Sequence, residues 1–177
     1  MYRIDKLIKL DRKIYHSNDL ALLWGITNKN TLYTTIKRYV QKGVLIPIFK
    51  GFYATVPVRQ LEPLELGKSI VHTYAYVSTE SVLAARGLIA QAVYPYTFVT
   101  SVSKSVTVDG MQFLYRKLKD PCLYNPLGIE NNHGVFVATP ERAVADMVYF
   151  NPQYHIDLSG HIDWKAVRKI QKEVGYL

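Results

Sequence analysis

The chain has 177 residues, of which 49% are apolar and 20% charged, and it carries a formal net charge of +8. This composition is that of a folded globular chain and excludes a disordered tail. No apolar run approaches the roughly 18 residues of a membrane span, and the first residues lack the apolar core of a signal peptide. The single Cys122 has no partner for an internal disulfide, so we expect a reducing, cytoplasmic location and no membrane association.

The positive charge is confined to the first third of the chain. Residues 1–60 contain 11 Lys and Arg against 3 Asp, whereas residues 61–177 contain 11 basic and 11 acidic residues. An excess restricted to one module is typical of a surface that meets a polyanion. The alternative is that these charges only keep a small domain in solution.

The first residues predict two helices. Apolar residues recur at roughly helical spacing over residues 4–14. Ser17 is a suitable N-cap for a second helix, because its hydroxyl can accept from the free amides of the first turn. Gly25 ends this helix at little steric cost.

A third helix is predicted to begin near Asn30, with that residue as its cap, and to stop at Gly43. At 100° per residue, one arc of the helix carries the apolar side chains of a buried stripe, namely Leu32, Ile36, Tyr39 and Val40. The opposite side carries polar and basic residues, with Tyr33 at the border. The helix therefore combines a buried apolar face with an exposed basic one.

The following residues, VLIPIFKGFYATV, predict a short β-hairpin. Two apolar runs, 44–49 and 52–56, flank Lys50-Gly51, and Gly51 suits the positive φ of a tight turn. Pro47 has no N–H to donate to a neighbouring strand, so its strand is an edge strand or bulged. Two helices joined by a short turn and followed by a hairpin predict a winged helix-turn-helix domain over residues 1–56.

The remainder predicts a small mixed α/β C-terminal domain over residues 57–177, with a linker at about 57–62. A helix is expected over residues 63–72, followed by a short strand and by a second helix that is capped by Ser78 and closed by Gly87. Residues 97–119 have strand character, with a hairpin at Asp109-Gly110. The fold class is therefore α+β.

The last elements of this domain are one more strand and two helices. The strand, GVFVAT, leads into a helix with Thr139 as its cap and Pro140 at its first position. Asp163 caps a final helix. Its expected apolar face consists of Trp164, Val167, Ile170 and Val174.

The basic face of the third helix is the candidate interface for double-stranded DNA. The outward face of such a helix enters the major groove. The groove-facing candidates are Asn30, Tyr33, Thr34, Lys37 and Arg38, of which Asn30, Thr34, Lys37 and Arg38 could contact base edges. Lys29, Lys42 and Lys50 are expected at phosphates, and Thr31 is also expected to belong to the DNA-binding surface. The competing interpretations are an ordinary solvated helix face, or a surface for a partner protein or RNA.

Catalytic and metal-binding patterns are weak. The five histidines are scattered and no paired cysteines accompany them, so we expect no metal and no cofactor. Asp157, Asp163 and Lys165 offer the closest approach to a nuclease arrangement, but Asp163 is better explained as a helix cap. The sequence has neither a phosphate-binding glycine loop nor a nucleophile elbow. We expect a protein without enzymatic activity.

Three passages of the chain resemble one protein family. They are NTLYTTIKRYVQKGVLIPIFKGFYA, YVSTESVLAARGLI and ATPERAVADMVYF. The first resembles the winged helix of the AbiE-type (AbiEi family) antitoxins of bacterial type IV toxin–antitoxin systems. The second resembles the passage that opens their C-terminal domain, and the third resembles their T-P-E-R-A-x-x-D helix.

The resemblance implies a protein with two tasks. The winged helix would repress its own operon by binding inverted repeats in the promoter, and the C-terminal domain would neutralise a nucleotidyltransferase-like toxin. Glu141, Arg142 and Asp146 match the polar residues of the family helix and are the antitoxin candidates. The alternative for these three is a structural role, because Arg142 and Asp146 have the (i, i+4) spacing of an intrahelical ion pair.

Overall fold

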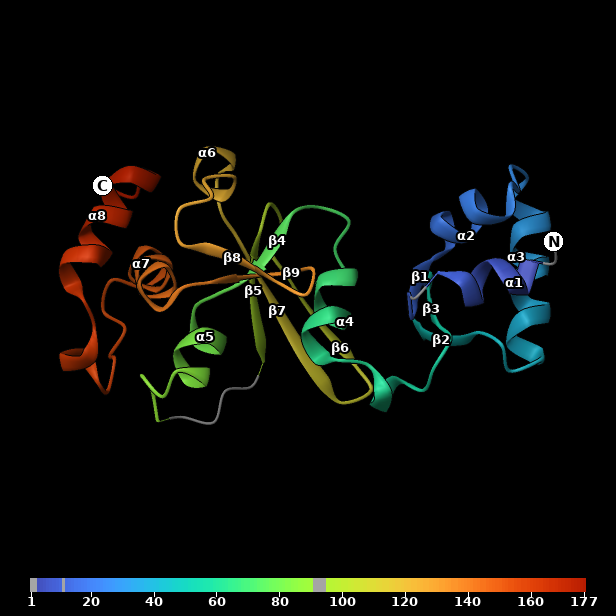
Figure 1. Ribbon diagram of the computed structural model, residues 1–177, viewed down its shortest axis with the longest axis horizontal. Helices are drawn as coiled ribbons and strands as arrows, with labels where there is room; N and C mark the ends of the chain where they lie inside the picture. Colours follow the sequence, from blue (N-terminus) through green and yellow to red (C-terminus); the bar gives the residue numbers. More distant parts are fainter. Residues whose placement is uncertain (1–2, 11, 91–94) are drawn as a thin grey trace. The chain divides into compact units, whose positions relative to one another are not determined.

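The computed structural model describes residues 3–10, 12–90 and 95–177. The chain divides into two compact units, Met1–Glu62 and Pro63–Leu177. Over the described ranges the fold is mixed α+β, with eight α-helices and two sheets (Figure 1). Within the same ranges, no helix combines the length and the apolar character that crossing a bilayer requires.

The first unit consists of three helices and a three-stranded sheet. Its elements are α1 (Arg3–Lys9), β1 (Ile14–His16), α2 (Ser17–Trp24), α3 (Lys29–Gln41), β2 (Ile46–Phe49), β3 (Phe52–Ala54) and a 3-10 helix, η1 (Val58–Gln60). The sheet is antiparallel with the order β1-β3-β2. The helices and the sheet share one core, made of Leu7, Tyr15, Leu20, Trp24, Ile26, Leu32, Ile36 and Leu45.

Strand β1 corrects the prediction of a helix over residues 4–14. Helix α1 ends at Lys9, and Ile14 pairs with Ala54 across an antiparallel ladder. Both Ile14 and Tyr15 are buried. Their backbone hydrogen bonds come from a strand about 40 residues further along the chain, so local periodicity could not reveal them.

The two predicted N-caps in this unit are also wrong. Helix α2 is capped by His16. The ring Nδ1 of His16 accepts a hydrogen bond from the backbone N–H of Asn18 (3.2 Å), and the backbone N–H of His16 donates to Asp19 Oδ2 (3.0 Å). Helix α3 is capped by Asn28, whose Oδ1 accepts from Thr31 N (3.1 Å). Asn30 lies inside the first turn. Each true cap precedes the predicted one by one or two residues, within the usual uncertainty of helix ends.

The hairpin agrees with its prediction in the turn and in the irregular strand. Gly51 has φ +79°, and Phe49 pairs with Phe52 across the two-residue turn. Strand β2 is an edge strand with a register shift between Pro47 and Phe49. The segment expected as a linker, 57–62, contains η1 and belongs to the first unit.

The second unit is built around a six-stranded sheet. Its helices are α4 (Pro63–Ser69), α5 (Glu80–Ala85), α6 (Asp120–Leu123), α7 (Pro140–Phe150) and α8 (Trp164–Val174), with a 3-10 helix, η2 (Ser159–His161). Its strands are β4 (Ala75–Val77), β5 (Tyr96–Thr100), β6 (Lys104–Val108), β7 (Met111–Lys117), β8 (Ile129–Asn132) and β9 (Val135–Ala138). The strand order is β6-β7-β5-β4-β9-β8, with parallel pairs at β5–β7 and β4–β9.

Helices cover both faces of this sheet (Figure 1). Helix α4 packs closely on one face, because a Cβ placed on Gly67 would lie only 2.5 Å from the Phe98 ring. On the other face, Thr97 bonds to Ser81 of α5, and Tyr76 bonds to Arg142 of α7. The alternation of side chains along β5 and β4 therefore assigns α4 to one layer and α5 with α7 to the other.

Several predictions for this unit need correction. Helix α4 ends at Ser69 rather than at residue 72. Ser78 does not cap α5. Thr79 precedes that helix with φ +52°, and the buried Ser78 hydroxyl donates to Asp146 Oδ2 (2.7 Å). Trp164 is 38% exposed, so it lies at the margin of the apolar face of α8.

Other predicted features of this unit are confirmed, and two elements were not predicted. Asp109 and Gly110 both have positive φ, as a type I′ turn requires. Thr139 and Asp163 cap α7 and α8 through their side-chain oxygens. Helix α6 and edge strand β8 have no counterpart in the prediction. Strand β8 reads IENN, which shows no apolar alternation because most of its residues are exposed.

A buried ion pair stands at the centre of the second unit. Arg142 and Asp146 on α7 are both 0% exposed, and Arg142 Nε donates to Asp146 Oδ1 (2.9 Å). The other guanidinium hydrogens also have acceptors: Nη1 donates to the carbonyls of Asn125 (3.2 Å) and Leu127 (2.9 Å), and Nη2 to Tyr76 Oη and the Cys122 carbonyl (both 3.0 Å). All five guanidinium N–H groups are therefore satisfied.

The Asp146 carboxylate is satisfied as well. Ser78 donates to Oδ2, and Tyr176, beyond the end of α8, donates to Oδ1. Burial raises the pKa of Tyr176, and Asp146 raises it further. Burial by itself lowers the pKa of Arg142, but Asp146, Tyr76 and Tyr176 reverse this and the net shift is upward. The cluster is thus an ion pair whose other hydrogen-bonding partners are neutral hydroxyl and backbone carbonyl groups.

We predict that Asp146→Asn destabilises the second unit by about 3–5 kcal/mol, because it leaves the Arg142 charge buried and uncompensated. Urea unfolding followed by circular dichroism measures the loss. Glu173→Gln is the matched control, since Lys169 and Glu173 form an exposed pair with the same (i, i+4) spacing. That change should cost no more than about 0.5 kcal/mol. Equal losses in the two variants would contradict the central role of the buried pair.

Candidate nucleic-acid interface

Helix α3 is held in one rotational setting by its apolar side. Leu32 and Ile36 are 5% and 2% exposed, and both belong to the core of the first unit. The half-buried Tyr39 ring stacks on Trp24 of α2, with centroids 5.2 Å apart. Val40 also packs against this core. The predicted apolar stripe is confirmed, with the two end residues only partly covered.

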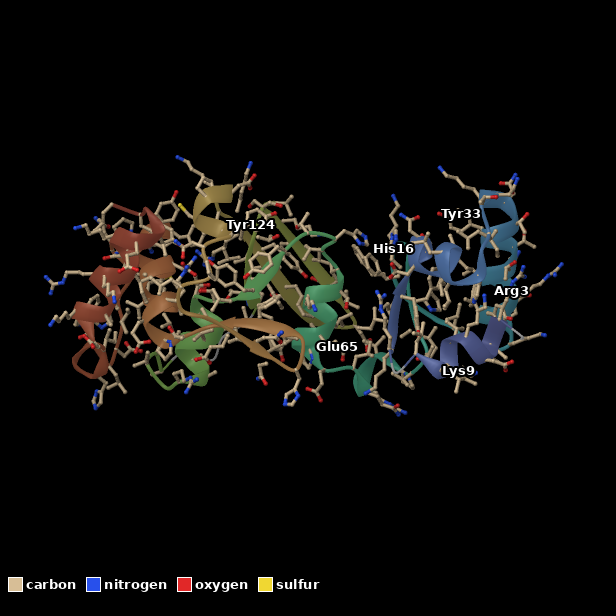
Figure 2. The ribbon with its side chains drawn as sticks, turned by 45° about the horizontal axis from the view of Figure 1, so that its top comes forward. Arg3, Lys9, His16, Tyr33, Glu65 and Tyr124 are labelled. Atoms are coloured by element: carbon tan, nitrogen blue, oxygen red, sulfur yellow. The ribbon has the colours of Figure 1, made fainter. Side chains whose placement is uncertain are left out.

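The opposite side of α3 and the hairpin turn are solvent-exposed. Every residue predicted to contact DNA is exposed: Lys29, Asn30, Thr31, Tyr33, Thr34, Lys37, Arg38, Lys42 and Lys50. Tyr33 projects from α3 with 52% of its surface exposed (Figure 2). Seven of these residues lie on α3, Lys42 is the C-cap residue that follows it, and Lys50 lies in the turn between β2 and β3.

The basic side chains of this surface form no ion pair with any residue that the structure describes. None of Lys29, Lys37, Arg38, Lys42 and Lys50 forms an ion pair or a side-chain hydrogen bond with another residue in the described ranges. Asp19 on α2 is occupied by Arg12. The positive potential of α3 is therefore not neutralised by these contacts.

The start of α3 is fixed by side-chain hydrogen bonds. Asn28 Oδ1 accepts from the N–H and the hydroxyl of Thr31, at 3.1 and 3.4 Å. One turn later, Thr35 Oγ1 donates to the Thr31 carbonyl (2.8 Å). Thr31 therefore acts in the cap of α3, which leaves little of its hydroxyl for an outside ligand.

The turn that carries Lys50 is packed against the start of α2. Ser17 N donates to the Gly51 carbonyl (2.8 Å), and the His16 and Phe52 rings lie 4.8 Å apart. A Cβ on Gly51 would come within 3.1 Å of His16 Nε2. Positive φ and this close approach both require glycine at that position. Lys50 is therefore presented by a firmly attached turn.

Two tyrosines of the first unit, Tyr33 on α3 and Tyr53 on β3, differ in accessibility. Burial raises the pKa of Tyr53, and Tyr33 raises it further. Tyr53 is half-buried, so Tyr33 is the member that an outside ligand can reach.

One basic residue near this surface was not predicted. Arg3, at the start of α1, lines a depression of about 180 Å³ together with Thr35, Arg38, Tyr39 and Lys42. Periodicity within a single helix does not indicate which other helix lies beside it, so no sequence signal connected Arg3 with α3. The structure brings Arg38 and Lys42 together with it.

The three antitoxin candidates on α7 differ in accessibility. Arg142 and Asp146 are fully buried, which favours the structural interpretation of this pair. Glu141 is half-buried and lines a cavity of about 270 Å³ with Arg86, Leu88, Pro140, His161 and Ile162. Of these three candidates, only Glu141 is accessible to a partner in this structure.

Within the parts of the chain that the structure describes, no three His, Cys, Asp or Glu side chains gather in a way that would hold a metal ion. Asp157 Oδ2 accepts from the Ala90 N–H (2.6 Å), and Asp163 caps α8.

No protein-family model matches the chain, and no curated protein matches it significantly.

We predict that Asn28→Ala destabilises α3 by about 1 kcal/mol, because it removes the N-cap. Hydrogen exchange of the α3 backbone amides measures this loss. Asn30→Ala is the control, because Asn30 lies inside the helix, where alanine has the higher helix propensity. It should leave exchange unchanged or slow it slightly. The reverse ranking of the two variants would place the cap at Asn30.

Proposed function

We propose that the first unit is a winged helix-turn-helix domain that binds double-stranded DNA. Helices α2 and α3 are joined by a short turn, and the β2–β3 hairpin follows α3 directly. The pairing of β1 with β3 closes the sheet around the hairpin as a wing. In this arrangement α3 is the recognition helix and the Lys50-Gly51 turn is the tip of the wing.

The observation that carries the proposal is the exposed and unpaired basic face of α3. An amphipathic helix needs only a polar outer side to be stable, and Lys29, Lys37, Arg38 and the C-cap Lys42 exceed that need, since none of them has an acidic partner among the described residues. Phosphate groups supply the missing counter-charge along a duplex. Lys37 and Thr34 lie opposite the buried stripe, where a groove-inserted helix meets base edges, whereas Lys29, Lys42 and Lys50 are placed for the backbone.

For the whole chain we propose the role of an AbiE-type antitoxin and transcriptional repressor of its own operon. Two of the three passages on which the resemblance rests lie in the second unit, on β4–α5 and on α7. Hydrogen bonds join these passages directly, from Arg142 to Tyr76 and from Ser78 to Asp146. The residues that carry the resemblance thus form one connected centre. Its surroundings would neutralise a nucleotidyltransferase-like toxin.

We predict that Lys37→Ala reduces the preference of the full chain for its own promoter over scrambled DNA by about 1–3 kcal/mol. Lys50→Ala should weaken binding to both duplexes equally, because phosphate contacts carry no sequence information. Fluorescence anisotropy at several salt concentrations measures both effects.

Lys172→Ala on α8 is the control for an equal loss of charge, and it should bind as the wild type does. If the wild type shows no salt-dependent affinity for either duplex, the DNA-binding proposal is wrong. Binding of a partner protein or of RNA would then remain as the function of this surface.

We further predict that a gene beside this one encodes a nucleotidyltransferase-like toxin, and that co-expression of the chain restores the bacterial growth that this toxin arrests. Because neutralisation is assigned to the second unit, the double variant Lys37→Ala, Arg38→Ala should restore growth equally well when the toxin has an unrelated promoter. Colony counts with and without the chain measure the rescue. Continued growth arrest in the presence of the wild-type chain would refute the antitoxin role while leaving DNA binding intact.

A further inference from the structure

A small depression beside the C-terminal half of α3 collects three cations from two helices. Arg3 of α1 lies on its rim together with Arg38 and Lys42, which are one turn apart on α3. Thr35 and Tyr39 complete the lining, and the volume is about 180 Å³. Figure 2 shows Arg3 and Lys9 at the two ends of α1, so only one end of that helix contributes a charge here.

The three cations have no counter-charge among the described residues. None of the described residues that line the depression is acidic, and the Arg3, Arg38 and Lys42 side chains make neither an ion pair nor a hydrogen bond with another described residue. Like charges that converge without an anion repel one another. An anion in the depression would remove this repulsion and could accept hydrogen bonds from all three.

The floor of the depression is rigidly held. Thr35 is 7% exposed, and its hydroxyl donates to the Thr31 carbonyl (2.8 Å). Tyr39 stacks on the buried Trp24. The cations on the rim therefore project from positions that the core of the first unit fixes, and little ordering of the backbone would accompany binding.

Helix geometry separates this depression from the base-facing side of α3. At 100° per residue, one stripe of α3 consists of Asn30, Thr34, Lys37 and Gln41, opposite the buried residues. Arg38 and Lys42 lie on a second stripe, rotated by about 100° toward α1. A helix in the major groove presents its centre line to the bases and its flanks to the two phosphate backbones.

We propose that Arg3, Arg38 and Lys42 together bind one backbone phosphate of the duplex, and we call these three residues the phosphate seat. This inference rests on the DNA-binding function proposed above. The paired N–H groups of an arginine match two phosphate oxygens, and the lysine adds a point charge. Arg38 thereby moves from the base-reading set to the backbone-contacting set. Sequence reading is left to the stripe that contains Thr34 and Lys37.

The test compares Arg3→Gln with Lys9→Gln in the full chain. Both changes remove one exposed charge from α1, but only Arg3 lines the depression. The salt dependence of affinity for promoter DNA should fall by about 1 in slope for Arg3→Gln. The ratio of affinities for promoter and scrambled DNA should not change. Arg3→Lys should restore most of the slope, and Lys9→Gln should behave as the wild type.

The possible outcomes separate this inference from the function on which it rests. If the wild type binds DNA and Arg3→Gln matches Lys9→Gln, the phosphate seat is wrong and DNA binding stands. If the wild type shows no salt-dependent DNA binding, both proposals fail. Loss of promoter preference in Arg38→Gln, with unchanged slope, would return Arg38 to the base-reading set and overturn the seat.

A methylphosphonate scan along the promoter duplex provides a second readout. At the seated phosphate, replacing the charged group should weaken wild-type binding but leave Arg3→Gln binding nearly unchanged, because the contact is already lost. Additive effects of the DNA change and of Arg3→Gln at every position would contradict a shared contact.

Discussion

The interface depends on the burial of one edge of α3. Leu32 and Ile36 are enclosed by the core of the first unit, and each such side chain contributes about 1.5–3 kcal/mol when it leaves water. Rotating the helix about its axis would expose both, so the rotational setting of α3 is determined by the core. The same constraint places Thr34 and Lys37 outward and Arg38 and Lys42 beside α1. The burial of Leu32 and Ile36 thereby determines which basic side chains of α3 point outward and which line the proposed phosphate seat.

The second unit depends on a different kind of constraint. Its centre is a charged pair whose polar atoms bond to one another and to three other parts of the chain: β4 with the adjoining Ser78, the segment around α6, and the residues after α8. Such a cluster is stable only when it is complete, because a buried charge without its partners is costly. It explains why Arg142 and Asp146 belong to one motif without either being reachable. The proposed neutralising surface would therefore consist of accessible residues around this centre, and the half-buried Glu141 is one of them.

Whether a feature could be predicted from the sequence depends on how far along the chain its hydrogen-bonding partner lies. The turns and the caps of α7 and α8 could be predicted because their partners lie within a few residues, as at Gly51, Asp109-Gly110, Thr139 and Asp163. Strand β1 was read as helix, because Ile14 is buried equally well in either form and its ladder partner, Ala54, lies far along the chain. The cap of α2 was missed because it is His16, which is not among the preferred N-cap residues, and the cap of α3 was misplaced because NKN offers two asparagines.

The sequence by itself determined the segregation of charge into residues 1–60, the amphipathic character of α3 and the hairpin that follows it. These properties depend on neighbours within about one or two turns, so the order of residues is enough to specify them. Three features could be seen only in the folded chain: Arg3 lines one depression with Arg38 and Lys42, β1 pairs in the sheet of the first unit, and Arg142 and Asp146 are fully buried. Each of these features depends on which segments pack against one another. That packing is determined by the burial of all the apolar side chains of a unit together, which no short stretch of sequence specifies.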